Sequence, residues 1–340
     1  MASSLAFAGA GWITAIHGLA VDAVPGLRVV QVASQRGLSA RRRAEQTGAV
    51  GCRYEDLPGG ADAVLVATPP AQHRREAERA VAGGAMAVVE TPLAATLADA
   101  DAIVALAAEG GRVAYAENLV HSPAAAEAVS ACRRIGTLTH LEVRFAQGRP
   151  DWSEHRHDPS WGGGALFDLG VHAIAVALLM AAPAHVAAVE SAKVEAGRAL
   201  EVDDDATVTL AFDTGLRAEV RASWRAAAPT WDAQAASRTG AVRLELVPDA
   251  SVEINGVALR IPPSPDRAVS PQLHYLGYIG QLEALLADVE SGRQPRSSAA
   301  FGRHVLEVVC AAYQTAATGA RTPLPYAGAR DLTPHEIWQS

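Results

Sequence analysis

The sequence predicts an α/β protein of two domains, a doubly wound parallel sheet over residues 1–118 and an α+β domain with an open, largely antiparallel sheet over residues 119–340. Continuous apolar strands alternate with amphipathic helices in the first part, as in parallel sheets that are covered on both faces. In the second part Thr207–Phe212 alternates polar and apolar residues, as a sheet with one covered face does.

The first domain is expected to contain five strands and four helices in alternation. The strands are Leu5–Ala8, Leu27–Ala33, Ala63–Ala67, Met86–Val89 and Arg112–Tyr115. The helices run from the glycine turn to about Asp22, then over Ser39–Thr47, Gln72–Ala82 and Thr96–Glu109.

The second domain is expected to be rich in strands and to end in two helices. The strands are His140–Ala146, Val186–Glu195, Ala206–Phe212, Leu216–Trp224, Asp232–Arg238 and Val242–Leu246. The helices are Val171–Met180, about Leu273–Ser291, and Ala299–Thr318.

Composition narrows the classes of function. The chain has 340 residues, a net charge of −8 and no long basic run, which argues against a nucleic-acid partner. Its longest apolar stretch, Val171–Ala182, is shorter than the ~20 residues that span a bilayer, so no membrane contact is expected. Three distant cysteines and the lack of a signal peptide favour a reduced, cytoplasmic location.

The glycine turn predicts dinucleotide binding in a Rossmann domain. Gly9 permits a tight turn after the first strand, and Gly11 lets a pyrophosphate approach the helix N-terminus that Trp12 and Ile13 open. The third glycine of the usual fingerprint is replaced by Thr14.

The end of the second strand favours NADP(H). It carries Ser34-Gln35-Arg36 and lacks the acidic residue that binds the ribose hydroxyl of NAD. Arg36 can pair with a 2′-phosphate, with Ser34 as a donor and one of the arginines 41–43 in support. Alternatively Arg36 stacks on adenine, and NAD(H) remains possible.

A candidate catalytic pair lies in Gly162-Gly-Gly-Ala-Leu-Phe-Asp168-Leu-Gly-Val-His172. The spacing of four places Asp168 and His172 on one helical face, about one turn apart. His172 can move a proton near neutral pH, and Asp168 can orient it or the substrate. The alternative is that Asp168 caps the helix and His172 is a packed surface residue.

A polar loop precedes that turn, and it can shape a substrate pocket. Trp152 and Trp161 could stack on a sugar ring. No third ligand accompanies His155 and His157 at a recognisable spacing, so no metal site is predicted. The alternative is a solvated loop whose tryptophans pin it to the core.

Several motifs in this order resemble the Gfo/Idh/MocA oxidoreductases, over nearly the whole chain. They are Gly9-Ala-Gly11, Val66-Ala-Thr68-Pro69 with His73, Val89-Glu90-Thr91-Pro92-Leu93, Ala116-Glu117-Asn118, Gly162–His172 and the helix containing Glu307 and Tyr313.

The resemblance implies hydride transfer between a nicotinamide and the hydroxyl or keto carbon of a sugar, polyol or related compound. It implies that Thr68, Pro69 and His73 line the cofactor loop and that Glu90 lies at the nicotinamide end. Asn118 would touch cofactor or substrate, with His121 as a further substrate-side residue. His172 would be the acid/base and Asp168 its partner.

One departure bears on activity. The family's Glu-Lys-Pro motif is here Glu90-Thr91-Pro92, and a threonine hydroxyl cannot supply positive charge to a developing alkoxide. Three interpretations follow: an active reductase with Thr91 orienting substrate, a non-redox glycosidase-like enzyme with bound NAD, or a dinucleotide-binding regulator. The intact Asp168/His172 pair favours the first.

Two further expectations concern the second domain. Trp224 and Trp231 are expected to cover an apolar open sheet face, which would pair with another subunit in a homodimer or homotetramer. The acidic run Glu201–Asp205 is expected to form a solvated turn, although a carboxylate there could reach a neighbouring subunit.

Overall fold

A computed structural model describes residues 2–151, 154–198 and 200–340. Contacts between Cα atoms divide the chain into two compact units. Unit 1 comprises Met1–Asn118 and Ser264–Arg303, and unit 2 comprises Leu119–Pro263 and His304–Ser340. Trp152, one of the two tryptophans assigned to the substrate, lies outside the described residues.

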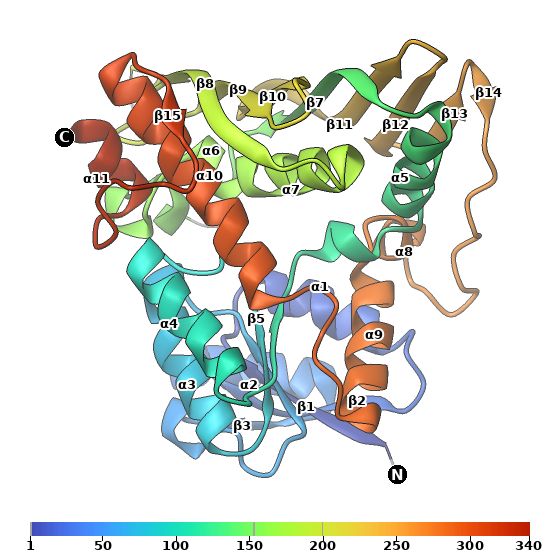
Figure 1. The fold of residues 1–340 in the computed structure, drawn as a ribbon. Helices are drawn as coiled ribbons and strands as arrows, with labels where there is room; N and C mark the ends of the chain where they lie inside the picture. The colour runs from blue at the N-terminus through green and yellow to red at the C-terminus, as the bar shows by residue number, and fades with distance from the viewer. Residues whose placement is uncertain (1, 152–153, 199) are drawn as a thin grey trace. The chain divides into compact units, whose positions relative to one another are not determined.

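Unit 1 is built on a six-stranded, wholly parallel sheet (Figure 1). In spatial order its strands are β3 (Val50–Cys52), β2 (Leu27–Ala33), β1 (Ser3–Ala8), β4 (Ala63–Val66), β5 (Met86–Val89) and β6 (Val113–Tyr115). Every residue of β4 and β5 is buried, as in strands covered on both faces. The order reverses between β1 and β4, where doubly wound sheets bind their ligands. The predicted fold class is confirmed here.

The helices of unit 1 follow its strands, as predicted. They are α1 (Trp12–Val21), α2 (Gly37–Thr47), α3 (His73–Ala82) and α4 (Leu97–Ala108), with short 3-10 turns at Tyr54–Asp56, Pro70–Gln72 and Asn118–His121. The bounds differ from the expected ones by one or two residues, mostly because caps such as Thr96 precede their helix.

The second domain is not one continuous segment, contrary to expectation. Residues 264–303 belong to unit 1 because the apolar face of the helices there packs into its core. The expected helix over residues 273–291 is two helices, α8 (Pro271–Tyr275) and α9 (Tyr278–Ser291). Gly277, with φ of +87°, separates them.

Unit 2 is built on a nine-stranded sheet whose neighbours are antiparallel except for β7 and β10 (Figure 1). In spatial order its strands are β14 (Val257–Ala258), β13 (Ser251–Ile254), β12 (Ala241–Val247), β11 (Arg225–Ser237), β7 (Leu138–Gly148), β10 (Arg217–Ser223), β9 (Asp205–Phe212), β8 (Val186–Glu195) and β15 (Thr322–Pro323). This open, largely antiparallel sheet confirms the predicted class.

Helices pack on the inner face of this sheet. They include α5 (Pro123–Ile135), α6 (Ala165–Asp168) and α7 (Gly170–Ala181). Unit 2 also contains the part of α10 (Ala299–Thr318) from residue 304 on, 3-10 turns at Glu154–His157 and Pro159–Trp161, and α11 (Pro334–Gln339). Helix α5 was not predicted from the sequence, although Ser122 caps it and Pro123 is its first residue, which is a recognisable start signal.

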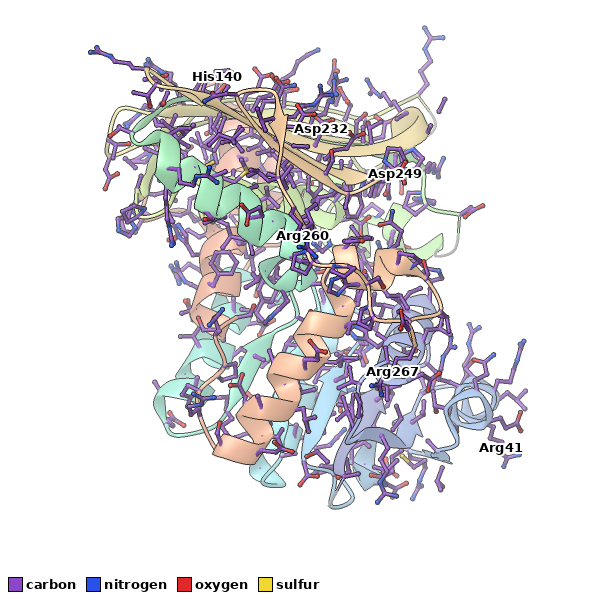
Figure 2. All side chains as sticks on the ribbon, turned by 90° about the vertical axis from the view of Figure 1, so that its right-hand side faces the viewer. Arg41, His140, Asp232, Asp249, Arg260 and Arg267 are labelled. Atoms are coloured by element: carbon purple, nitrogen blue, oxygen red, sulfur yellow. The ribbon has the colours of Figure 1, made fainter. Side chains whose placement is uncertain are left out.

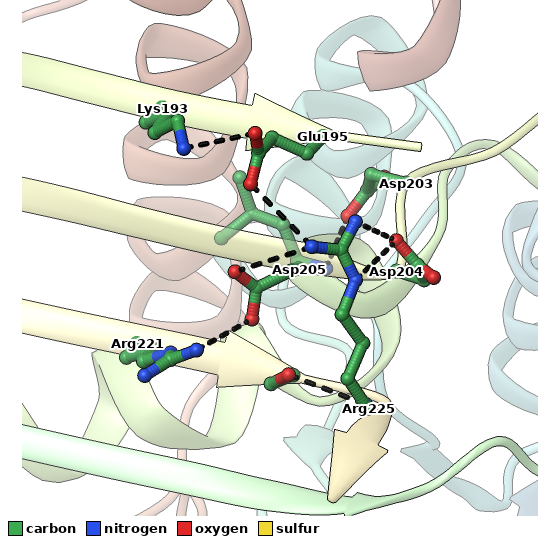
Figure 3. A network of polar contacts seen from close by, with 9 residues as sticks. Lys193, Glu195, Asp203, Asp204, Asp205, Arg221 and Arg225 are labelled. Carbon is green, nitrogen blue, oxygen red and sulfur yellow. Dashed lines mark hydrogen bonds and ion pairs between the residues drawn. The ribbon is translucent and has the colours of Figure 1, made fainter. Parts of the chain in front are cut away.

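The outer face of the sheet is charged, contrary to the expected apolar face. Arg144 on β7 donates to Asp232 on β11 at 2.8 Å, and Figure 2 shows Asp232 on this sheet. Arg221 donates to Asp205 at 3.1 Å in the network of Figure 3. Trp231 lies instead on the inner face, because it pairs with the buried Phe145 in the strand register.

The burial of α7 explains why its sequence is apolar. Ten of its twelve residues are buried within unit 2. No single helix among the described residues is long and apolar enough to cross a membrane. The segments Pro159–Asp168 and Gly170–Ala181 meet the length and composition requirement only when taken together, and they are bent by 42°.

Candidate functional site

The glycine turn after β1 is shaped by its neighbour β4. Gly9 has φ of +133°, and a Cβ there would collide with the carbonyl oxygen of Ala67. A Cβ on Gly11 would meet no atom within 4 Å, so it would project into open space before the N-terminus of α1. Gly11 thus leaves room for a ligand at this helix N-terminus, where backbone N–H groups favour an anion.

Two nearby side chains bind the carbonyl oxygen of Gly11, and one of them is Thr14, which replaces the third glycine of the usual fingerprint. Thr14 is fully buried, and its hydroxyl donates to the carbonyl of Gly11 at 2.8 Å, so its added polar group is satisfied. Arg43 on α2 donates to the same carbonyl at 3.0 Å, and burial lowers the pKa of its guanidinium. Trp12 is 45% exposed and Ile13 is half-buried.

The end of β2 presents a short polar turn. The backbone N–H of Arg36 donates to the hydroxyl of Ser34 at 3.3 Å, and Arg36, the residue before α2, has an exposed side chain. No acidic residue lies between Ser34 and Arg43 in the sequence. A phosphate on the ribose would therefore meet positive charge in this segment.

His73 joins the loops that follow β4 and β5. One ring nitrogen lies 2.8 Å from the carbonyl oxygen of Thr68 and the other 3.2 Å from that of Leu93. The ring is 1% exposed, and burial lowers its pKa. A neutral imidazole donates only one of these bonds. His73 thus connects the loops after β4 and β5, whereas Thr68 presents a buried hydroxyl with no hydrogen-bond partner among the described residues.

A buried His–Glu pair that was not predicted from the sequence lies between α1 and the end of β5. His17 on α1 is fully buried, and its Nε2 lies 2.6 Å from a carboxylate oxygen of Glu90. The other carboxylate oxygen accepts the backbone N–H of Thr91 at 3.2 Å. The pair therefore fixes the backbone at Thr91. A single histidine inside the apolar sequence of α1 was the available signal.

Asn118 is buried and binds within unit 1. Its amide donates to the carbonyl of Leu276, between α8 and α9, at 2.6 Å. This contact anchors the end of the first continuous segment to the returning segment 264–303. His121, assigned to the substrate side, is half-buried at the end of the same 3-10 turn.

In unit 2 the triple-glycine turn rests on a buried carboxylate. Asp203 is fully buried and accepts the backbone N–H groups of Gly164 at 2.9 Å and Leu166 at 2.8 Å. It also accepts the hydroxyl of Tyr313 on α10 at 2.5 Å. The pKa of Asp203 is raised above its usual value, because the effect of burial exceeds the opposite effect of these hydrogen bonds.

Glycine is required in this turn because the support lies so close. A Cβ on Gly164 would collide with the backbone of Asp203, and one on Gly163 would come within 2.8 Å of the Tyr313 hydroxyl. The expected solvated turn over Glu201–Asp205 is therefore wrong at Asp203. Its neighbour Asp204 fits that expectation better, since it pairs with Arg225 (Figure 3).

Asp168 is the last residue of α6 and is 8% exposed. Its carboxylate forms an ion pair with Arg156, whose guanidinium lies 5.6 Å from the centroid of the Trp161 ring. The cation is thus held between a carboxylate and an aromatic face. Leu169 separates α6 from α7, so Asp168 and His172 do not share one continuous helix as expected.

His172 lies in the first turn of α7 and is half-buried. Its ring stacks on that of Trp231, with centroids 6.2 Å apart and planes at 20°. Nearby, His157 meets the edge of Trp224 at 5.7 Å, and burial lowers the pKa of His157. The described residues contain no group of three or more histidine, cysteine or acidic side chains able to hold a metal.

Both units match models of known protein families. Residues 4–118 match the model of an oxidoreductase family with an NAD-binding Rossmann fold, and residues 123–247 match that of the GFO/IDH/MocA C-terminal domain. A D-xylose 1-dehydrogenase (NADP(+)) of Haloferax volcanii is 27% identical over 77% of this chain and 80% of its own.

A dTDP-3,4-didehydro-2,6-dideoxy-alpha-D-glucose 3-reductase of Streptomyces antibioticus is 32% identical over 48% of this chain, a match that spans about half (52%) of the reductase. Among solved structures, GenD2 from gentamicin A biosynthesis, in complex with NAD, is 24% identical with a TM-score of 0.84, over 95% of this chain and 96% of its own. The aldose-aldose oxidoreductase of Caulobacter crescentus is 22% identical with a TM-score of 0.83, over 95% and 100%. At these identities the two structures establish the fold alone.

Proposed function

The chain belongs to the Gfo/Idh/MocA oxidoreductase family, and we propose that it transfers hydride between NADP(H) and the hydroxyl or keto carbon of a sugar or polyol. The observation that carries the proposal is the substrate-side constellation of unit 2. His172 opens α7 directly after a carboxylate that is paired with a guanidinium.

The bound nicotinamide supplies the hydride acceptor or donor. The chain supplies the proton chemistry, because a hydroxyl that becomes a carbonyl must also lose its proton. His172 takes that proton in oxidation and returns it in reduction. Asp168 and Arg156 form a charged pair beside it that orients substrate hydroxyls, and Trp161 offers an aromatic face to a sugar ring.

The residues of unit 1 fit a dinucleotide. The open space at Gly11 would receive the pyrophosphate. The buried Thr68 hydroxyl has no hydrogen-bond partner among the described residues and could donate to the cofactor. Thr91 replaces the family's lysine. Its backbone is fixed by Glu90 and its hydroxyl orients the substrate without supplying charge.

Cofactor preference is tested by replacing Arg36. We expect Arg36→Ala to weaken NADPH binding about 10- to 100-fold, the value of a charge-assisted phosphate contact, and to leave NADH binding within about threefold. Arg28→Ala is the matched control, since Arg28 is also exposed but lies near the start of β2, away from the turn that follows this strand. Equal losses for NADPH and NADH in Arg36→Ala would contradict the NADP(H) preference.

The activity is tested by adding sugars and polyols to protein saturated with NADPH or NADP⁺ and following nicotinamide absorbance. Turnover of any compound supports the proposal. Tight cofactor binding without turnover would favour a dinucleotide-binding regulator. Sugar release without net change in absorbance would favour glycosidase-like chemistry.

We also propose a homodimer or homotetramer formed through the outer sheet face. Its support is electrostatic, since that face carries paired charges of both signs, such as Arg144 with Asp232 and Arg217 with Glu190. The same face of a second copy could extend these pairs into charge networks across an interface, and salt would screen such networks. Sedimentation at low and high ionic strength tests this, and a monomer under both conditions would contradict it.

A further inference from the structure

We propose that Trp231 is a positioning residue that sets the plane of the His172 imidazole. The inference rests on the proposed function, in which His172 moves the proton of the reacting hydroxyl. The residue that orients His172 would then lie on β11, outside the motif Gly162–His172.

A stack of three rings carries the proposal. Phe145 on β7 and Trp231 on β11 are direct partners in the strand register, and their rings stack at 4.9 Å with planes at 8°. Phe145 is fully buried, so the surrounding core holds its ring in place. The His172 ring lies on the same indole at 6.2 Å and 20°. The register of the sheet therefore determines the plane available to the imidazole.

The indole restrains a rotation that the helix backbone leaves open. Helix α7 fixes the backbone of His172 but not the rotation of its ring. Asp168, which motif spacing suggests as the orienting group, is paired with Arg156 and lies beyond the break at Leu169.

Stacking also suits the chemistry. Both nitrogens of a stacked imidazole lie in the ring plane, so the indole supports the ring without blocking their hydrogen bonds. When His172 takes up a proton, the imidazolium is attracted to the indole face. The ion pair between Asp168 and Arg156 does not need to break during this step.

A fluorescence titration of the protein without cofactor or substrate tests the contact itself. An imidazolium quenches an adjacent indole more than neutral imidazole does, so the fluorescence–pH curve should contain a component due to this pair. We expect His172→Gln to remove that component in the wild-type background and to change nothing in a Trp231→Phe background. His157→Gln controls for the separate contact of His157 with Trp224. A His172-dependent component that persists in Trp231→Phe would overturn the proposal.

Kinetics test the positioning role. We expect Trp231→Leu to lower kcat roughly 10- to 100-fold, as loss of orientation does, with KM changed by less than about threefold. Trp231→Phe should restore most of the activity, because it keeps a stacking face. Trp231→Leu added to His172→Gln should cost little more, because the positioned group is already absent.

Three results would contradict positioning. They are additive losses in the double variant, a loss confined to KM, and an equal loss in Trp224→Leu, whose indole contacts His157 instead. A chain that turns over no sugar would refute the proposed function alone, because the fluorescence titration still decides whether Trp231 holds the imidazole.

Discussion

Removing the carboxylate of Asp203 should destabilise unit 2 strongly, because that group supports the turn leading to Asp168 and His172. Asp203→Ala takes the acceptor from three buried donors, the N–H groups of Gly164 and Leu166 and the hydroxyl of Tyr313. Each hydrogen bond to a charged group contributes about 1.5–3 kcal/mol.

The sum of those contributions is reduced by the cost of burying the carboxylate, the same cost that raises its pKa. The net loss expected for Asp203→Ala is therefore about 3–5 kcal/mol of unfolding free energy, the range for a broken buried polar network. Urea unfolding followed by circular dichroism measures it, with Tyr313→Phe expected to show a smaller loss of about 1–2 kcal/mol.

Asp204→Ala is the matched control. Asp204 is the next residue and pairs with Arg225, whose side chain is 42% exposed (Figure 3). Such a pair contributes about 1 kcal/mol or less. If Asp203→Ala cost no more than Asp204→Ala, the idea that Asp203 supports the triple-glycine turn would be refuted.

Three further predictions concern unit 1. Gly11→Ala should keep the thermal stability of the fold and weaken NADPH binding more than tenfold in a fluorescence titration, since its methyl group enters the open space; unchanged affinity would move the pyrophosphate elsewhere. His17→Ala should cost about 3–5 kcal/mol in urea unfolding because it leaves the Glu90 carboxylate buried without its partner, and a loss under 1 kcal/mol would show that the pair is dispensable. Burial lowers the pKa of His73, so its contribution to stability is present above the unfolded value of 6.5 and is lost as pH falls through the lower folded value. The difference in unfolding free energy between wild type and His73→Gln should therefore shrink between about pH 8 and pH 5, and a difference that grows would reverse the sign of the argument.

Local pattern was sufficient where a segment is buried on both faces. Met86–Val89 has the predicted bounds, because a short run of apolar residues is typical of a strand that is covered on both faces. Leu27–Ala33 also has the predicted bounds, although Arg28 is exposed. The glycine turn was equally legible, since strand, glycines and helix follow one another in the sequence. The break at Leu169 was not predicted, because the residues after Asp168 read as the start of one apolar helix.

Residues that act through distant contacts could not be read from spacing. Asp203 stands in a run of acids that resembles a solvated turn, and only its contact with Gly164, 39 residues away, shows that it is buried. His17 and Glu90 are 73 residues apart. Trp231 was placed on the wrong sheet face because one-residue shifts of register exchange the two faces, and the bulge between Trp231 and Asp232 lies at this point.

The most direct test of the account is the rate of NADP⁺ reduction by wild type and His172→Gln with the best substrate of the sugar and polyol panel. The account predicts turnover by the wild type, a loss of about 100-fold or more in kcat for the variant, and unchanged NADPH affinity in both. Full turnover by His172→Gln would contradict the assignment of the proton-transfer residue and, with it, the proposed mechanism.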